Sequence, residues 1–522
     1  MPSLDVVFLI IVVMALMSGY PVGLTLGGIS ILFAIVAWSL GAFDPALFSA
    51  IPSRLFGIMN SQVLLAIPLF VFMGLVLEKS GLAENMFRAF AKLLRHRAGG
   101  LTIAVTLVGM LMAASTGIVG ASVVTLGLLA LPAMLKEGEQ PTLAAGSVAA
   151  AGTLGQIIPP SIVLIVLGDQ MSNAYQKMQT DAGNFAPDTV SVPDLFAGAL
   201  LPGLLLVALY LVWQVFAHKS VQRSERVPKS VQPEQQDSPV PLLLAILPPL
   251  VLILLVLGSI LGGVATPSES AALGAVGALL LAARRGVWDE DADRFYAVPL
   301  AGLISLILLF AMRLVLSPEA GLSLAVARFL VLAVVIALAD ALITLFKRNQ
   351  LMPVLDDSVH LISMIFLIVI GASIFSLVFR GLGGDATIAS LLSDLPGGTW
   401  GALCVVMLIL FVLGFFLEFI EITYVVVPLV APVLLAMPMA DGSLMNPVWL
   451  GVLIALNLQT SFLTPPFGVS LFYLRSVAPA AITTATLYRG VVPFVVLQLL
   501  ALVIVMIFPM LVTWLPSLLY GS

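Results

Sequence analysis

An apolar run from Ala144 to Gly168 is long enough to cross a membrane, but its middle cannot remain a regular α-helix. The segment Gly152-Thr-Leu-Gly-Gln-Ile-Ile-Pro-Pro-Ser161 interrupts it with two glycines and then two consecutive prolines. A proline in a helix interior removes a backbone hydrogen bond and clashes with the preceding turn. In hydrocarbon, backbone opened in this way persists only where protein or a water-filled cavity satisfies it. Such a break is typical of an ion or substrate site in a secondary transporter, although a kink used only for packing would leave the same pattern.

A second Pro-Pro break lies near the other end of the chain, in Asn457-Leu-Gln-Thr-Ser-Phe-Leu-Thr-Pro-Pro-Phe-Gly468. Each break follows a polar tip and an apolar leg that ends at a proline. The first leg runs from Ser115 to Pro132, and the second from Glu418 to Pro432. The order of tip, leg, proline, short loop and broken helix therefore occurs twice. An internal repeat of this kind points to the binding site of a transporter.

Composition identifies a polytopic helical membrane protein. Hydrophobic residues make up 61% of the chain and charged residues 9%, against roughly 45–50% and about 25% in soluble domains. The single cysteine, Cys404, lies in an apolar run, so no disulfide framework is expected. No cleavable signal peptide is evident, because the apolar stretch Met1–Met17 lacks a basic region and continues into the next apolar run.

The two repeat units are predicted to be re-entrant hairpins of opposite orientation. Residues 101–135 form the first hairpin, with Ser115-Thr-Gly117 at its tip, and the basic residues at its mouth, including Lys136, place that mouth in the cytoplasm. The second hairpin runs from Trp400 to Met437 with its tip at Phe416–Thr423, and its mouth is acidic, so it should open outside. Two similar units of opposite orientation form an inverted repeat.

The rest of the chain is arranged around these units. Residues 83–97 mix basic and aromatic side chains, as in a helix at the membrane surface. Residues 169–194 should form an acidic outer loop, and residues 491–515 a last span. The predicted divisions are N-terminal scaffold helices with an interfacial helix (1–100), a first transport unit (101–168), scaffold helices with a central linker and two inserted spans (169–399), a second transport unit (400–475) and a C-terminal helix (476–522).

The repeat motifs resemble those of the large membrane subunit of tripartite ATP-independent periplasmic (TRAP) transporters, in particular the subgroup named for mannitol and chloroaromatic compounds. The resemblance covers nearly the whole chain. It is carried by Ala114–Thr125, Gly152–Ile162, Gly414–Ile422, Asn457–Gly468 and, between the halves, Gly262–Ala271.

This resemblance implies an all-α, multi-pass protein of the bacterial inner membrane that imports an organic acid by an elevator-type, sodium-coupled mechanism. Sodium would be the coupling ion, and no other cofactor is expected. The implied partners are a small four-helix membrane subunit and a periplasmic substrate-binding protein.

Three features depart from the family pattern. The first tip, Ser115-Thr-Gly-Ile-Val-Gly120, is less rich in serine than in many members. Glu418 stands where an aspartate is expected. Two spans at 297–346 look like an insertion; they contain Arg328 and Asp340, for which an interhelical ion pair or snorkelling is expected rather than transport.

Sodium is a hard cation that prefers oxygen ligands. Unwound segments expose backbone carbonyls, and the N-termini of half-helices suit a carboxylate. Each tip is therefore expected to form a sodium and substrate site with its break, with packing alone as the alternative. The candidates are Ser115, Thr116, Gly117, Gly152, Gly155, Pro159, Pro160 and Ser161 in the first unit, and Glu418, Glu421, Thr423, Asn457, Gln459, Thr460, Ser461, Thr464, Pro465 and Pro466 in the second.

Glu418 and Glu421 are three residues apart and so share one face of a helix. A carboxylate at mid-membrane depth costs about 2.5–3.5 kcal/mol on the insertion scale, which favours a functional role for the pair. The alternative is a shallow, hydrated tip at which both are ordinary interfacial charges.

Other classes of function lack their motifs. The sequence contains neither His-Glu-x-x-His nor Gly-x-Ser-x-Gly, so an enzyme is not expected. It also lacks Gly-x-x-x-x-Gly-Lys, so its motifs give no support for transport driven by ATP through this chain. The nearest alternative is a stand-alone transporter of the divalent-anion/sodium symporter type, which works without a binding protein. A channel is the weaker alternative. The sequence does not determine the exact substrate, the sodium stoichiometry or the oligomeric state.

Overall fold

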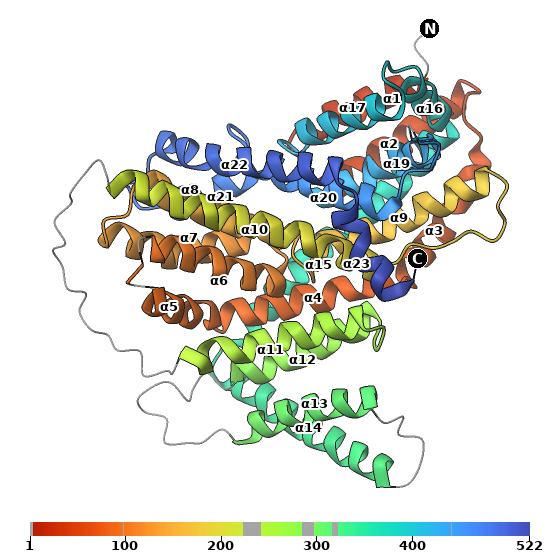
Figure 1. Ribbon diagram of the computed structural model, residues 1–522. Coiled ribbons are helices and arrows are strands. Elements are labelled where there is room, and N and C mark those ends of the chain that lie inside the picture. Colours follow the sequence, from red (N-terminus) through yellow and green to blue (C-terminus); the bar gives the residue numbers. More distant parts are fainter. Residues whose placement is uncertain are drawn as a thin grey trace.

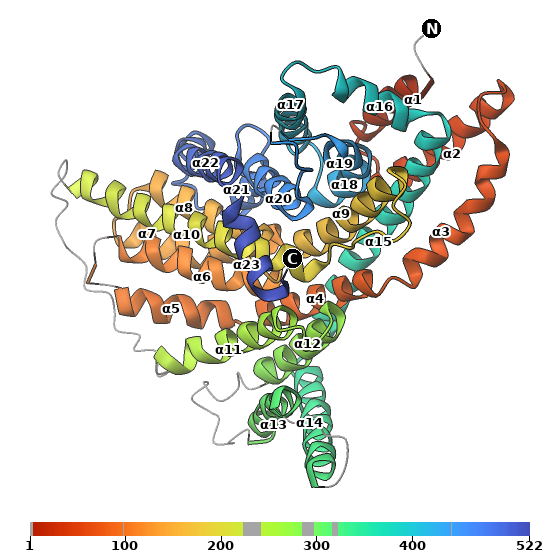
Figure 2. The same ribbon diagram turned by 45° about the vertical axis from the view of Figure 1, so that its right-hand side comes forward.

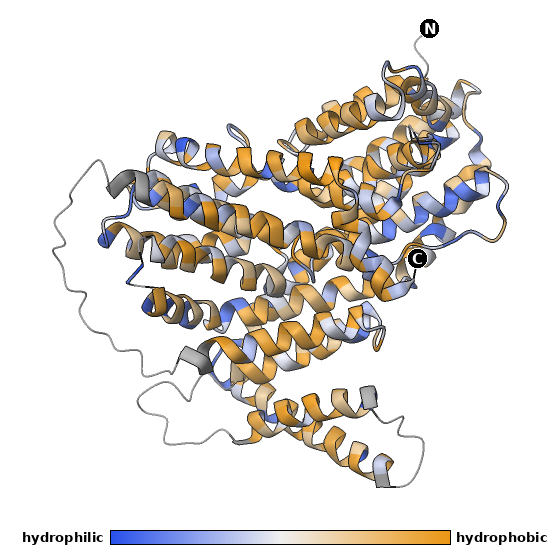
Figure 3. Ribbon diagram, viewed as in Figure 1, coloured by the Kyte–Doolittle hydropathy of each residue, from blue (hydrophilic) through white to orange (hydrophobic). Residues whose placement is uncertain are grey.

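The computed structural model describes residues 4–94, 96–97, 99–222, 242–283, 297–315, 322–439 and 441–521, and it is built from helices throughout these ranges. Among them, seven helices are long and apolar enough to cross a membrane, or up to nine if each of two bent pairs is one span. Figure 1 shows them as a broad bundle, and Figure 3 shows that hydrophobic residues dominate nearly every helix. The predicted all-α polytopic fold is confirmed.

The N-terminal helices form one side of this bundle. Their bounds agree with the apolar runs of the sequence, because each run ends at a Gly, Pro or polar cluster that stops a helix. The long helix α15 (Leu351–Gly381) packs along two of them, α2 and α4. The N-terminal elements are α1 (Leu4–Leu16), α2 (Val22–Ser39), the 3-10 helix η1 (Pro45–Ser49), α3 (Ala50–Met59) and α4 (Gln62–Lys79).

The predicted surface helix is α5 (Leu82–Leu94), which buries Met86 and Phe87 on one face and exposes Arg88 on the other. Arg88 forms an i,i+4 ion pair with Glu84 at 2.5 Å. The helix ends at Leu94 rather than at residue 97, and Arg95 lies outside the described residues.

The first repeat unit contains the predicted hairpin and broken helix. Its last helix extends further than expected, to Asp181, so the prediction of a loop over 169–194 is wrong in its first half. The polar residues after Gly168 continue the helix until Gly183 (φ +85°), whose left-handed backbone ends it. The elements are α6 (Gly100–Thr116), α7 (Val119–Lys136), α8 (Pro141–Thr153), the 3-10 helix η2 (Leu154–Gln156) and α9 (Ile162–Asp181).

The second repeat unit has the same order of hairpin and broken helix. The predicted tip, Phe416–Thr423, is too long, because a helix begins again at Phe419 and Thr423 lies inside it. The returning leg bends by 56° between α18 and α19, where Pro428 lacks a backbone N–H. The elements are α16 (Gly384–Ser393), α17 (Gly398–Leu413), α18 (Phe419–Val425), α19 (Val427–Ala436), α20 (Pro447–Leu463) and α21 (Val469–Val477).

The remaining helices connect the units and close the bundle. The single span predicted at 491–515 is in fact two helices, since the residue before Pro509 is disfavoured in helical conformation and α22 stops there. The inserted pair α13–α14 extends away from the bundle beneath α12 (Figures 1 and 2), and Arg328 on α14 is exposed. The bounds are α10 (Val192–Gln222), α11 (Leu242–Leu261), α12 (Pro267–Ala283), α13 (Ala297–Val315), α14 (Leu322–Lys347), α22 (Thr484–Ile507) and α23 (Met510–Tyr520).

In each repeat unit, the second half of the broken helix packs against the hairpin of the other unit. Helix α8 packs on its own hairpin, α6 and α7, whereas α9 leaves this unit and packs on α19 of the second hairpin. In the second unit α20 packs on α17, and α21 packs on α7 of the first hairpin. In Figure 1, α7, α8 and α21 accordingly lie on the left, and α9 and α19 on the right. The hairpins therefore enter the bundle from opposite ends, as an inverted repeat requires.

Candidate functional site

The first break lies entirely inside the protein. Helix α8 ends at Thr153, one 3-10 turn continues to Gln156, and non-helical backbone leads to an extended Ser161 before α9 begins. Every residue from 151 to 168 is buried. The Ser161 hydroxyl donates to the Gln156 carbonyl at 3.0 Å, and the peptide bond between Pro159 and Pro160 is cis. The structure thus surrounds this opened backbone with protein.

The tip of the first hairpin rests on this break. Gly117 turns the chain with φ +60°, a left-handed conformation that favours glycine, and its Cα lies 3.6 Å from where a Gly155 Cβ would be. Gly152 has no room for a side chain, since its Cβ would lie 2.3 Å from Val123 of α7. Gly155 therefore lies against Gly117 at the tip, and Gly152 lies against α7. The side chains of Ser115 and Thr116 lie outside the described residues.

The tip of the second hairpin rests on the second break in the same way. A Cβ on Gly414 would lie 2.0 Å from the Ser461 hydroxyl oxygen, and the Phe416 and Phe467 rings are 5.3 Å apart. In contrast to the first break, Pro466 and Phe467 are exposed. The second break is therefore the more accessible of the two.

Several predicted residues of the second break are occupied by local hydrogen bonds. The Thr460 hydroxyl donates to the Leu456 carbonyl at 2.8 Å, and the Thr464 hydroxyl donates to the Thr460 carbonyl at 2.7 Å. Asn457 donates its amide to the Met407 carbonyl of α17 at 2.7 Å. That bond gives Asn457 a role in packing the hairpin on α20.

Glu418 and Glu421 begin α18. The Glu418 backbone N–H donates to the Glu421 carboxylate at 3.1 Å, and the two residues form a capping box. Glu421 is only 6% exposed, so it is not a charge on a hydrated surface. By accepting the Glu418 N–H, the Glu421 carboxylate stabilises the start of α18, a structural role that was not predicted from the sequence.

Tyr473 of α21 packs against the first hairpin and was not selected from the sequence. A Cβ on Gly120 of that hairpin would lie 2.9 Å from the Tyr473 ring. Nothing in the local sequence around Tyr473 marks it as a site residue. Its position near the first hairpin follows only from the packing of α21 against α7.

A buried polar cluster joins the two breaks at Thr153, which sequence reasoning also missed. The Gln459 and Gln498 amide nitrogens lie 3.4 Å and 3.5 Å from the Thr153 hydroxyl oxygen, and Tyr210 of α10 faces the same cluster. The sequence does place Thr153 and Gln459 within long apolar runs, and such isolated polar side chains could have indicated a buried polar cluster.

Unused oxygen atoms remain around both sites. Among the described residues, the amide of Gln156, the hydroxyl of Thr423 and the amide oxygens of Gln459 and Gln498 are buried without a hydrogen-bond partner. Such groups are costly to bury unless water or an ion satisfies them. No group of three His, Cys, Asp or Glu side chains that could hold a metal ion occurs within the described ranges.

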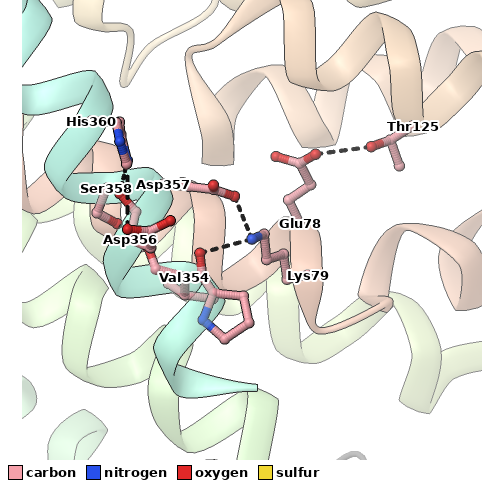
Figure 4. A network of polar contacts seen from close by, with 9 residues as sticks. Glu78, Lys79, Thr125, Val354, Asp356, Asp357, Ser358 and His360 are labelled. Atoms are coloured by element: carbon pink, nitrogen blue, oxygen red, sulfur yellow. Dashed lines mark hydrogen bonds and ion pairs between the residues drawn. The ribbon is translucent and has the colours of Figure 1, made fainter. Parts of the chain in front are cut away.

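Figure 4 shows a contact between the first hairpin and the helices outside it. The Thr125 hydroxyl of α7 donates to the Glu78 carboxylate of α4 at 3.1 Å. The neighbouring Lys79 donates to the Pro353 carbonyl at 2.9 Å and pairs with Asp357 of α15. A movement of the hairpin relative to α4 would have to break the contact of Thr125 with Glu78.

Comparison with solved structures gives a likeness of fold. The crystal structure of the Alcanivorax borkumensis YdaH transporter matches with a TM-score of 0.50 and 18% identity, over 90% of each chain.

Comparison of sequences gives the family. The model of the DctM component of the tripartite ATP-independent periplasmic transporter matches residues 8–295 and 286–511. The chain is 28% identical to the C4-dicarboxylate TRAP transporter large permease protein DctM of Vibrio cholerae, over 98% of this chain and 97% of the relative. It is 25% identical to the sialic acid TRAP transporter large permease protein SiaM of Vibrio cholerae, over 97% of each. This chain belongs to the DctM family, the large permease components of TRAP transporters.

Proposed function

We propose that this chain imports an organic acid across the bacterial inner membrane with sodium as the coupling ion. The observation that carries the proposal is the meeting of the two breaks: hairpins from opposite ends rest on them, and Gln459 reaches Thr153 across the junction. Family membership supports two partners, a small membrane subunit and a periplasmic substrate-binding protein.

The sodium ions would be held where opened backbone and unused side-chain oxygens coincide. In the first site these are the carbonyls between Gly152 and Ser161 together with Gln156. In the second they are the carbonyls from Ser461 to Pro466 together with Glu418 and Thr423. Oxygen is the ligand that a hard cation prefers.

The substrate would be a carboxylate. Three helices, α9, α18 and α21, begin at or beside the breaks and the second tip, and the N-terminus of a helix attracts negative charge. The relatives named for C4-dicarboxylates and sialic acid handle substrates that carry carboxylates. The likeness to them supports an acid of this class.

An elevator movement is the mechanism that this packing favours. Because the units exchange α9 and α21, both hairpins and both broken helices would move as one body past α2, α4 and α15. The hydrogen bond between Thr125 and Glu78 would then be present in one end state of the movement and absent in the other.

Uptake by purified components in liposomes tests the proposal, with radiolabelled succinate as the first probe. We expect uptake only when this chain, the small subunit and the binding protein are all present and an inward sodium gradient is imposed. Full uptake by this chain alone would instead support a stand-alone symporter. Uptake that is equal with sodium and with choline would reject sodium coupling.

A further inference from the structure

A cavity of about 540 Å³ lies away from the two breaks, between the outer helices and the second hairpin. Its walls come from α3, α4 and α15 on one side and from α9, α18 and α19 on the other. In Figure 1 these walls lie near α3 and α9, at the end of the molecule opposite the mouth of the first hairpin. Pockets for small molecules typically enclose about 300–1,000 Å³. The cavity therefore has room for a small organic acid.

Positive charge exceeds negative charge along this cavity. Arg54, Lys177 and Arg380 line it, while Asp169 is the acidic lining residue. Asp385, just outside, pairs with Lys177 and lies 3.7 Å from Arg380 Nε. Even when Asp385 is included, three cations face two carboxylates.

Arg54 is the cation that this arrangement leaves without a carboxylate. Its guanidinium donates to the Ser373 carbonyl at 3.4 Å, and no carboxylate among the described residues lies within ion-pair distance of it. Arg380 lines the same cavity as Arg54. The Arg380 Nε is buried without a hydrogen-bond partner in the described part of the chain. Two guanidinium groups that line one cavity and keep unused donors form an arrangement that a bound anion would stabilise.

We infer that this cavity is an entry site in which Arg54 and Arg380 bind the carboxylate of the substrate before it reaches the breaks. A guanidinium group matches a carboxylate with two parallel hydrogen bonds, so the pair can hold an organic anion in this cavity. Tyr424 and Pro428 of the second hairpin form the facing wall, so a ligand here contacts both the outer helices and the hairpin. The inference rests on the proposed import of an organic acid.

Transport kinetics with succinate test the role of the arginines in the complete three-component system. Arg54→Gln and Arg380→Gln should each raise KM for succinate about tenfold, equivalent to about 1.4 kcal/mol, with kcat within twofold of wild type. Arg54→Lys keeps the charge but loses the paired donors, so its KM should lie between those of wild type and Arg54→Gln. Arg88→Gln is the matched control, since Arg88 is exposed on α5, and its KM should not change. A wild-type KM in both glutamine variants would overturn the inference.

Occupancy of the cavity can be measured without transport. Asn173 lines the cavity and is exposed, so Asn173→Cys in a Cys404→Ala background can be labelled with a thiol reagent. Succinate should slow labelling at least threefold, the neutral diamide succinamide should not, and Arg54→Gln should abolish the protection. Protection without sodium-driven uptake would refute the proposed function but retain the site, whereas normal uptake without protection would refute the site.

A lipid phosphate offers the same chemistry as a carboxylate. Labelling in phosphatidylcholine liposomes is therefore compared with labelling after addition of phosphatidylglycerol, both without succinate. Equal rates support an organic acid as the occupant. Slower labelling with phosphatidylglycerol, with no further effect of succinate, would assign the cavity to a lipid headgroup and overturn the inference.

Discussion

The side-chain amide of Gln459 lies 3.4 Å from the Thr153 hydroxyl oxygen, although these residues are 306 positions apart in the chain. Thr153 donates in turn to the Ala150 carbonyl at 2.8 Å, and Gln498 of α22 approaches the same oxygen. The hydroxyl thus connects the first broken helix to the second and to α22. Because all three side chains are buried, the geometry of one break depends on the other.

Thr153→Val should uncouple the breaks. Valine has nearly the same shape but no hydroxyl, so it leaves the buried amides of Gln459 and Gln498 without their acceptor, at a cost of about 1–3 kcal/mol. We expect a lower melting temperature of the purified protein and a marked loss of uptake. Thr153→Ser is the control and should retain both. Wild-type stability and uptake in Thr153→Val would exclude the proposed role of this hydroxyl.

Glu418→Gln tests whether this carboxylate contributes to sodium coupling. The substitution keeps the size of the side chain and removes its charge, so the protein should still insert and bind its partners. Uptake should lose most of its dependence on the sodium gradient, whereas Glu418→Asp should keep it. If Glu418→Gln retains wild-type sodium dependence at matched expression, Glu418 has no part in coupling.

Glu421→Ala should have a different effect from Glu418→Gln. It removes the acceptor for the Glu418 N–H at the start of α18, and loss of a helix cap costs about 0.5–2 kcal/mol. We expect a lower melting temperature, with sodium dependence preserved in the protein that remains folded. An unchanged melting temperature would show that the capping box contributes little.

The two hairpin mouths should face opposite sides of the membrane. Lys136 at the end of α7 and Asp441 after α19 are both exposed, so a cysteine at either position can react with an impermeant thiol reagent. In a Cys404→Ala background, Asp441→Cys should react from outside in intact cells, and Lys136→Cys only after permeabilisation. Equal labelling of both from one side would refute the predicted orientation.

The carboxyl group of Glu139 should make stability depend on pH. It lies in the turn between α7 and α8, 3.4 Å from His218 Nδ1. Burial raises the pKa of the Glu139 carboxyl above its ordinary value, opposed by the neighbouring His218. Because the folded protein binds this proton more tightly than the unfolded chain does, protonated Glu139 stabilises the fold at pH values below its ordinary pKa. This stabilisation is lost as the pH rises through the higher pKa of the folded protein. The wild-type melting temperature should therefore decline across this window.

Glu139→Gln removes this titration. The melting temperature of the variant relative to wild type should rise from pH 5 to pH 8. Glu137→Gln is the comparison: Glu137 is exposed and its charge adds to the raised pKa of Glu139, so its removal should shift the decline to lower pH without abolishing it. Identical pH profiles for the two variants would show that burial of Glu139 has no such effect.

The sequence by itself determined the architecture, because the features that specify it are local. A proline removes a backbone hydrogen bond from a helix, and long apolar runs require the membrane. Pro248 and Pro249 nevertheless lie inside the continuous helix α11, so a proline pair predicts a break only together with the repeated tip and leg that precede it. The breaks at Gly152–Ser161 and Asn457–Gly468 and the two hairpins were predictable for this reason. The errors were in boundaries: polar residues kept α9 helical to Asp181, and Pro509 divided the last apolar run.

Only the tertiary structure decided which side chains meet. Asn457 and Glu421 remain candidates for the sodium and substrate sites, and the fold adds contacts that the sequence did not predict: Asn457 donates to the Met407 carbonyl, and Glu421 takes part in the capping box of α18. Thr153 and the cavity between Arg54 and Arg380 gained importance only from helices that are distant in sequence. A hydrogen bond between distant residues depends on how helices pack, and no local pattern of residues specifies that packing.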